Sequence, residues 1–482
     1  MKFIRKNFLI IILLSLSILT RFIFLDYPSE AVFDEVYFGR YTNSYFTHNF
    51  EFFLHPPFAE MIFAGFGYLF GYFPHSDFIH IGDSVNPRDI FLLRFMPALF
   101  GSLLPLLIYF FLRKIGVSKK FAFLGGLFII FDNAVLVESR LILTDILLLF
   151  FGFLSIFLYL FYREGNEPFN WRKKTATYFI LSIFSASFAF SIKWTALSFM
   201  GIIGLSMIVD LIKKLDLKDF ILKTCLAVVI FIPTYYFIFW THTNILYRSG
   251  AGDAYTSNQF QGTLVKNDSA FEKMPQWQKF IELNNAMFFY NVATLKATHP
   301  YSSFWLEWPF GKKPIWYWSG SKDETFANIY LMGNIIVWLM VAVGIIFSVC
   351  LIFVKKYRKK LPLFFWFLLI GYFANLLPYI FVSRVTFLYH YLPSLVFGIM
   401  ILAVLLDKIA FPYLCEIIAK RKSKELSLKI SGAVYSGILA AAVAGFLIIA
   451  PISYGMKISE KANTRYQNFI NVFLNSKSGE SK

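Results

Sequence analysis

Two adjacent carboxylic acids, Asp34 and Glu35, follow the first apolar stretch of the chain in the segment FDEVYFGRY. A histidine, His55, comes later in LHPPFAE, directly before two prolines. A carboxylate or an imidazole can act as a general base toward a hydroxyl group. The acids could instead favour a helix N-terminus by their charge, and His55 could be a turn residue. The residue types alone leave both interpretations open.

Three further short segments combine acids, cations and aromatic residues. VESRLILTD, SIKWTAL and VSRVTFLYHYLP carry Glu138, Arg140, Asp145, Lys193, Trp194, Arg384, His390 and Tyr391. Arginine holds phosphate through a planar fork that is always charged. We therefore assign donor-phosphate binding to Arg140, Arg384 and Lys193.

Aromatic and polar residues near these cations suit contacts to a sugar or an acceptor. The substrate-binding candidates are His55, Trp194, Asp145, His390, Tyr391, Trp305 and Trp308. Together with the acids, they predict glycosyl transfer from a lipid-linked phosphate to an external hydroxyl. One base and one stabilised leaving group are enough for a displacement that inverts the sugar.

Structural readings of the same residues remain. Arg140 could pair with Glu138 or Asp145, or reach lipid headgroups. Lys193 and Trp194 could anchor a helix at the membrane interface. His390 could be a satisfied core residue, and the tryptophans could form an interfacial belt.

A metal site is not predicted, because no spacing of acids and histidines requires one. A metal needs several ligands that converge. Asp34, Glu35, His55 and His390 could supply oxygen and nitrogen ligands. A divalent metal therefore stays open as a cofactor.

The composition defines the setting in which these residues must be positioned. The chain has 482 residues, of which 57% are hydrophobic and 16% charged, with 61 phenylalanines. A soluble protein carries roughly 25% charged residues. Apolar stretches long enough to cross a bilayer recur along the chain. The sequence predicts an all-α polytopic membrane protein, a single domain over 1–482.

About eleven spans are predicted from length and polarity. They cover 7–25, 90–112, 121–137, 142–162, 175–192, 195–212, 220–240, 327–354, 361–381, 385–406 and 431–453. The first span is expected to stay uncleaved. The segment 58–73 is short and glycine-spaced, so we expect a re-entrant or interfacial helix there.

The net charge of +17 comes from basic residues gathered in short turns between apolar spans. This is the positive-inside pattern rather than a nucleic-acid signal. It places two long loops, 26–89 and 241–326, on the extracytoplasmic side. All four polar segments then meet at that face of the membrane.

At these residues the chain resembles the protein O-mannosyltransferase family of GT-C glycosyltransferases. The matching segments are FDEVYFGRY, LHPPFAE, LLRFMPALFGSL, ESRLILTD, SIKWTAL, SSFWLEWPFGKKPIWYW, SRVTFLYHYLP and APISYG, in family order. Two departures stand out. Glu60 occupies a position near HPP where the family commonly has lysine, and 241–326 is too short for the MIR insertion of eukaryotic members. The resemblance therefore implies a bacterial-type member.

The resemblance also implies a fold, a donor and an acceptor. These are an eleven-span GT-C fold, a polyprenyl-phosphate mannose donor and Ser or Thr hydroxyls of exported proteins. The family's acidic pair falls on Asp34 and Glu35, with the first as candidate base, and its phosphate-binding arginine falls on Arg140. Transfer to a lipid or glycan, or a transporter or flippase function, remain as alternatives. The identity of the sugar and the oligomeric state are left undefined.

Overall fold

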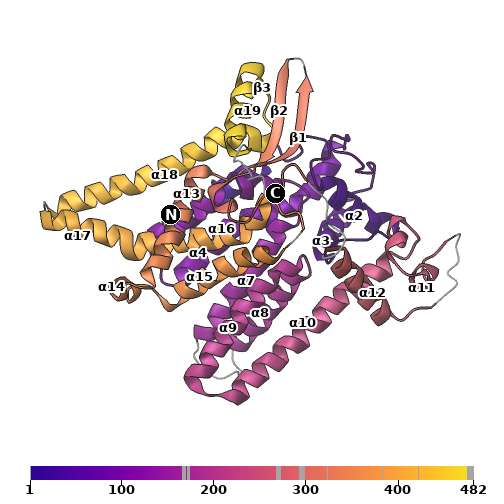
Figure 1. Cartoon of the computed structure of the whole chain (residues 1–482), viewed down its shortest axis with the longest axis horizontal. Helices are drawn as coiled ribbons and strands as arrows, with labels where there is room; N and C mark the ends of the chain where they lie inside the picture. The colour runs from indigo at the N-terminus through magenta and orange to yellow at the C-terminus, as the bar shows by residue number, and fades with distance from the viewer. Residues whose placement is uncertain are drawn as a thin grey trace, which may run out of the picture.

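The apolar stretches of the sequence fold into a helical bundle with a small sheet at one end (Figure 1). The computed structural model describes residues 2–164, 170, 174–266, 273–291, 299–322, 324–382, 384–421 and 423–474. Most of the expected basic turn at 163–174 lies outside these residues. The bounds of the longer apolar helices are α1 (Lys2–Phe22), α4 (Pro87–Lys114), α7 (Asp145–Glu164), α8 (Lys174–Phe190), α9 (Leu197–Lys214), α10 (Leu217–Ile245), α13 (Ile335–Leu351), α15 (Leu363–Leu376), α16 (Leu392–Leu405) and α18 (Lys424–Tyr454).

Among the described residues, seven helical stretches are long and apolar enough to cross a membrane. The bent pair α5 (Lys119–Ile130) and α6 (Asn133–Arg140) would make an eighth. The shorter apolar helices α1, α8 and α13 occupy the other three predicted spans. The chain is thus a multi-pass integral membrane protein, as its composition predicts.

Three short elements complete the end of the bundle that carries the sheet. Strands β1 (Ile315–Lys322), β2 (Thr325–Leu331) and β3 (Ile458–Ser459) form an antiparallel sheet in that order. Because 325–331 is a strand, the predicted span at 327–354 is wrong at its start, and its helix begins at Ile335. In β1, the three consecutive aromatic residues Trp316, Tyr317 and Trp318 precede a run of small residues, and the pairing with β2 is irregular between Trp316 and Trp318.

The remaining short helices connect the bundle to its loops. They are α2 (Glu35–Thr47), α3 (Phe58–Leu69), η1 (Trp194–Ala196), η2 (Ala251–Tyr255), α11 (Asn258–Gly262), α12 (Gln276–Phe289), η4 (Trp308–Phe310), α14 (Lys355–Arg358), η5 (Leu377–Phe381), η6 (Leu388–Tyr391), the π-helical turn η7 (Leu406–Ala410), α17 (Phe411–Arg421) and α19 (Glu460–Leu474). Helix α3 has the apolar, glycine-containing sequence expected of the segment at 58–73.

The α5–α6 break bends the chain by 59° and is held by two buried charged residues. The Arg21 guanidinium donates to the carbonyls of Ile129 and Ile130, which end α5. The Asp132 carboxylate accepts from Val135 N at the start of α6 and from the Trp338 indole of α13. Free backbone groups at helix ends need such partners. The break therefore has a defined geometry, and α6 points toward the sheet end of the molecule.

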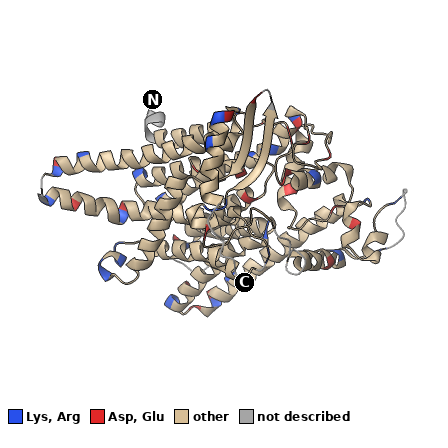
Figure 2. Cartoon of the chain, turned by 45° about the horizontal axis from the view of Figure 1, so that its top comes forward, with Lys and Arg blue, Asp and Glu red and all other residues tan. Residues whose placement is uncertain are grey.

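Many basic residues gather in turns at the end of the bundle away from the sheet, while others lie close to the sheet, on α19 and in the segment before β1 (Figure 2). Figure 2 shows Lys and Arg at the left-hand tips of α17 and α18 and on α14, whereas the sheet, α2 and α3 lie away from these tips. The described turns at the basic end carry Lys114, Lys213, Lys214, Lys355, Lys356 and Lys424. The basic turns at this end of the bundle agree with the predicted grouping of basic residues in short turns.

Candidate active site

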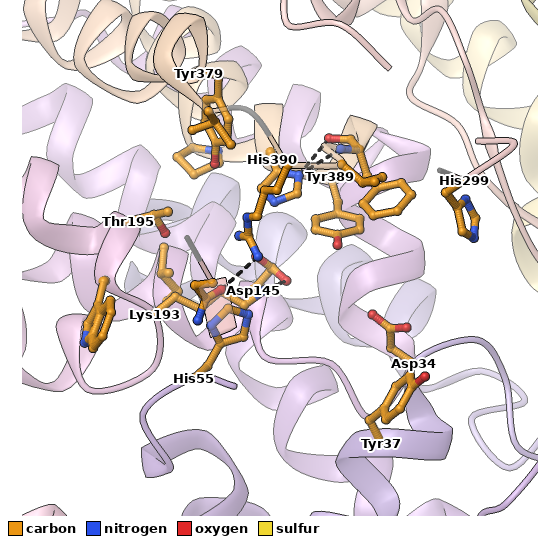
Figure 3. Close-up of a pocket in the computed structure, with 18 of the residues that line it drawn as sticks. Asp34, Tyr37, His55, Asp145, Lys193, Thr195, His299, Tyr379, Tyr389 and His390 are labelled. Atoms are coloured by element: carbon orange, nitrogen blue, oxygen red, sulfur yellow. Dashed lines mark hydrogen bonds and ion pairs between the residues drawn. The ribbon is translucent and has the colours of Figure 1, made fainter. Parts of the chain in front are cut away.

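A cavity with a volume of about 630 Å³ lies where the predicted polar segments meet. The first loop contributes Phe33, Asp34, Tyr37 and His55 to its wall. The other lining residues include Asp145, Leu148, Lys193, Trp194, Thr195, Asn291, His299, Tyr379, Phe381, Arg384, Phe387, Tyr389 and His390 (Figure 3). The structure therefore brings together residues from all four segments that the sequence singled out.

Asp34 lies at the N-cap position of α2, yet its side chain makes no capping hydrogen bond. The carboxylate is half-buried in the cavity wall (Figure 3). Desolvation raises the pKa of Asp34 to about 7, while the positive charge of Lys193 opposes the shift and Asp145 adds to it. A carboxyl with this pKa has the proton affinity that suits a general base near neutral pH.

Glu35, the next residue, points away from the cavity into a fully buried ion pair with Arg94. The two carboxylate oxygens accept from Arg94 Nε and Nη2 at 2.8 and 2.7 Å. They also accept from the backbone N–H groups of Ile142 and Val32 at 2.8 and 2.9 Å. Glu35 thus connects the Asp34 turn to the α6–α7 connection. The sequence analysis expected Glu35 to be a catalytic acid, but its side chain does not line the cavity.

Lys193 and Asp145 form a pair on the wall next to His55 (Figure 3). Lys193 Nζ lies 2.6 Å from Asp145 Oδ2, and both side chains are largely buried. Asp145 begins α7, and Lys193 stands in extended backbone directly before η1. The carboxylate therefore orients the ammonium group at the cavity surface.

Arg384 supplies a second cation from the chain before α16. Its Nη1 donates to Asn291 Oδ1 at 2.8 Å, and Asn291 is held in turn by donating to Leu54 O. Within the described part of the chain, Arg384 forms no ion pair with a carboxylate. Its charge is therefore available to an anion in the cavity.

Three histidines line the cavity, and the surroundings of His55 and His390 define what these two can do. Burial lowers the pKa of His55 well below 6.5, and the nearby charges of Lys193 and Arg384 lower it further. His55 is therefore neutral and can accept a hydrogen bond. His390 Nδ1 lies 3.0 Å from both N and O of Phe387, which fixes the ring within its turn.

Arg140 does not line this cavity, in contrast to the predicted phosphate contact. Its guanidinium donates to the carbonyls of Arg21, Ile23 and Phe24 at the C-terminal end of α1. Its other face stacks on the Tyr454 ring at 4.5 Å. The donor groups of Arg140 are engaged by the helix end, so it braces α1 against α6.

The predicted aromatic contacts divide into two groups. Trp194 lines the cavity, and its indole donates to Tyr235 Oη at 2.9 Å. Tyr391 is buried against Tyr372 and Trp338, and Trp308 is buried with its ring stacked on His390. Trp305 packs against the apolar core. The described cavity wall does not include Tyr391, Trp308 or Trp305. Trp308 instead packs behind His390, which does line the cavity.

Several residues of the wall were missed by the sequence analysis. They are Tyr37, Thr195, Asn291, His299, Tyr379, Phe381 and Tyr389. His299 precedes a proline as His55 does, and Tyr389 adjoins His390, so both had a local signal. Asn291 and Tyr379 had none, because their positions depend on how α12 and η5 pack.

The described residues contain no group of three or more His, Cys, Asp or Glu side chains placed to hold a metal ion. The cavity instead combines one unpaired carboxylate, two cations and several rings. Such a wall can accept a proton, bind a phosphate and hold a polar ring-shaped substrate.

Comparison with known proteins identifies the family. The model of the dolichyl-phosphate-mannose-protein mannosyltransferase family matches residues 11–247. The model of the C-terminal four-span region of protein-O-mannosyltransferase matches residues 276–471. Together the two models extend over both halves of the chain.

Individual relatives agree with these matches. The Candida albicans dolichyl-phosphate-mannose–protein mannosyltransferase 4 is 31% identical over 272 residues, which is 54% of this chain and 36% of the relative. The mouse protein O-mannosyl-transferase 1 is 29% identical over 347 residues, which is 68% of this chain and 43% of the relative. The chain thus matches less than half the length of these curated relatives.

Solved structures share the fold. One is the Saccharomyces cerevisiae protein O-mannosyltransferase Pmt1–Pmt2 complex bound to the sugar donor, with a TM-score of 0.82 and 19% identity over 96% of this chain and 92% of that one. Another is ArnT from Cupriavidus metallidurans bound to undecaprenyl phosphate, with a TM-score of 0.51 and 14% identity over 97% and 77% of the two chains. The predicted polytopic GT-C fold is confirmed. From the two family models, this chain belongs to the dolichyl-phosphate-mannose-protein mannosyltransferase family.

Proposed function

We propose that this protein is an inverting glycosyltransferase that moves mannose, or another hexose, from a polyprenyl-phosphate carrier to Ser or Thr hydroxyls of exported proteins. One observation carries the proposal: an acid with a pKa of about 7, Asp34, shares a cavity with the cations Lys193 and Arg384. A base and a phosphate site in one cavity are the two parts that a single displacement needs. The family match and the names of its members support mannose as the sugar.

In the proposed reaction, Asp34 accepts the proton of the acceptor hydroxyl. The hydroxyl oxygen attacks the anomeric carbon from the face opposite the phosphate. The bond between that carbon and the phosphate oxygen breaks, and its electron pair leaves with the polyprenyl phosphate. Arg384 and Lys193 stabilise the negative charge on the leaving phosphate, a role that the sequence analysis assigned to these two residues together with Arg140.

The remaining wall residues divide between binding and orientation. Asp145 orients Lys193 through their 2.6 Å contact. Neutral His55 and the Trp194 ring lie beside this pair and provide a hydrogen-bond acceptor and a flat apolar face for the sugar. Glu35 acts through the backbone, by holding the turn that carries Asp34.

The charge distribution of the bundle indicates which side of the membrane the cavity faces. We assign the basic end of the bundle to the cytoplasm by the positive-inside rule. The cavity then faces the extracytoplasmic side, where exported proteins pass. For a bacterial-type member this is the outer face of the cytoplasmic membrane.

The test uses purified protein in lipid nanodiscs with polyprenyl-phosphate mannose labelled in the sugar. The acceptors are a peptide rich in Ser and Thr, the same peptide with Ala at those positions, and membrane lipid. We expect label in the first peptide alone. Label in lipid would replace this proposal with lipid or glycan transfer, and movement of intact donor across liposomes without bond cleavage would replace it with a flippase.

A further inference from the structure

A buried contact outside the cavity connects the sheet to the turn that carries Asp34. The Tyr317 side chain of β1 is fully buried and lines no described cavity. Its ring stacks on Phe33, with centroids 3.9 Å apart and planes 6° from parallel. Its carbonyl accepts from Phe33 N at 3.1 Å. Tyr317 therefore holds the residue directly before Asp34 by both ring and backbone.

Phe33 needs this support because of its backbone conformation. Its φ angle is +49°, in the left-handed region that a bulky side chain rarely adopts. Such a conformation persists where surrounding contacts determine it. The backbone conformation at Phe33 therefore sets the direction in which the Asp34 side chain points.

The Tyr317 hydroxyl is fixed by Glu138 of α6. It donates to Glu138 Oε1 at 2.6 Å, and both side chains are buried. The second oxygen, Oε2, has no hydrogen-bond partner among the described residues. Burial raises the pKa of Tyr317 well above 10, and the negative charge of Glu138 raises it further, so the hydroxyl stays a donor.

Glu138 itself lies in a short helix that is held at both ends. Asp132 caps the start of α6, and Arg140, the last residue of α6, donates hydrogen bonds to the end of α1. A rigid path thus runs from the helix break through Glu138 and Tyr317 to Phe33. The Glu138–Tyr317 and Tyr317–Phe33 contacts connect residues that are far apart in sequence, so both depend on the tertiary fold.

We infer that Glu138 and Tyr317 are positioning residues for Asp34, acting through the Tyr317 hydroxyl and the Phe33 turn. The catalytic part of this inference rests on the proposed function. Neither residue touches the substrate. Because a small displacement of a reacting group can cost a large factor in rate, their loss lowers kcat and leaves donor binding intact.

The first variant is Tyr317→Phe, which keeps the ring stack and removes the hydroxyl. We expect kcat to fall about tenfold or more, with the donor KM within about twofold of the wild-type value. Glu138→Gln keeps an acceptor for the hydroxyl, so it retains most of the wild-type kcat. The double variant Glu138→Leu/Tyr317→Phe falls no further than Tyr317→Phe alone, because both changes remove one contact.

The matched control is Tyr454→Phe. The Tyr454 hydroxyl donates to Thr20 O at 2.8 Å and so also joins distant parts of the chain, without a hydrogen bond to Glu138 or Tyr317 among the described residues. This variant keeps the wild-type kcat. A Tyr317→Phe protein that folds and keeps kcat within twofold would overturn the inference, as would a Glu138→Gln protein as impaired as Tyr317→Phe.

A second measurement does not depend on transfer. Hydrogen exchange of peptides that cover 31–37 reports the order of the Phe33 turn directly. We expect faster exchange there in Tyr317→Phe and unchanged exchange in Tyr454→Phe. If the wild-type protein transfers no sugar, the proposed function fails, while unchanged exchange in Tyr317→Phe would refute the brace itself.

Discussion

The carboxylate of Glu35 binds the guanidinium of Arg94 through two hydrogen bonds of 2.8 and 2.7 Å, with both side chains fully buried. The side chain of its neighbour Asp34 makes no capping hydrogen bond to α2 and faces the cavity instead. Two adjacent acids therefore have different parts. Glu35 holds the backbone of the first loop and of the α6–α7 connection, and Asp34 remains available for a proton.

This division predicts a loss of stability for Glu35→Ala. The change leaves Arg94 as an uncompensated buried charge, which costs about 3–5 kcal/mol of unfolding free energy. Thermal unfolding in detergent measures the effect. Glu425→Ala is the control, because the Glu425–Lys429 pair on α18 is exposed and such pairs contribute about 0–1 kcal/mol. Equal destabilisation by the two changes would contradict the role given to Glu35.

Arg384→Gln and Arg140→Gln should have opposite signatures. Arg384 faces the cavity without a carboxylate partner, so Arg384→Gln raises the donor Kd about tenfold or more with little change in stability. Arg140→Gln removes hydrogen bonds to three carbonyls at the end of α1, one of them buried and two partly buried, and lowers the unfolding free energy by about 2–4 kcal/mol.

Binding of labelled polyprenyl-phosphate mannose and thermal unfolding separate the two variants. The folded fraction of Arg140→Gln should bind the donor like the wild-type protein. If Arg140→Gln lost donor binding but kept its stability, this would show that Arg140 binds the donor phosphate.

The pH dependence of transfer should report Asp34. Its pKa of about 7 means that the base form increases as pH rises through 7, so kcat rises over that interval to a plateau. Lys193 lowers this pKa and Asp145 raises it. Lys193→Gln should therefore move the midpoint to higher pH, and Asp145→Asn should move it to lower pH.

The two shifts are measured from kcat at saturating donor, which removes effects on donor affinity. Lys193→Gln also lowers the plateau, because Lys193 contacts the leaving phosphate in the proposed reaction. Midpoints that stay fixed in both variants would show that another group controls the rate.

Much of the fold followed from the sequence because length and polarity decide which segments can cross a bilayer. The positions of Asp34, His55, Lys193 and Arg384 at one face also followed, because each adjoins the end of an apolar stretch. Strand β2 was missed because its residues are apolar and continue directly into α13. Hydropathy alone does not distinguish a buried strand from the start of a span.

The roles of the charged residues were harder to predict than their positions. Arg140 has the residue type of a phosphate ligand, but its direction depends on where α1 ends. Glu138 meets Tyr317 only because α6 and the sheet pack together. Contacts of this kind leave no periodic signal in the sequence. They depend on the direction of α6, which the 59° bend between α5 and α6 sets.

The central claim is that Asp34 is the base. The most direct measurement compares Asp34→Asn with wild-type protein in transfer from labelled polyprenyl-phosphate mannose and in binding of the same donor. Asp77→Asn, which changes an exposed acid of the same loop, is the control. We predict that Asp34→Asn loses about 10²–10⁴-fold in kcat, as expected for loss of a general base, with donor Kd unchanged and Asp77→Asn fully active. Transfer by Asp34→Asn at the wild-type rate would contradict the assignment.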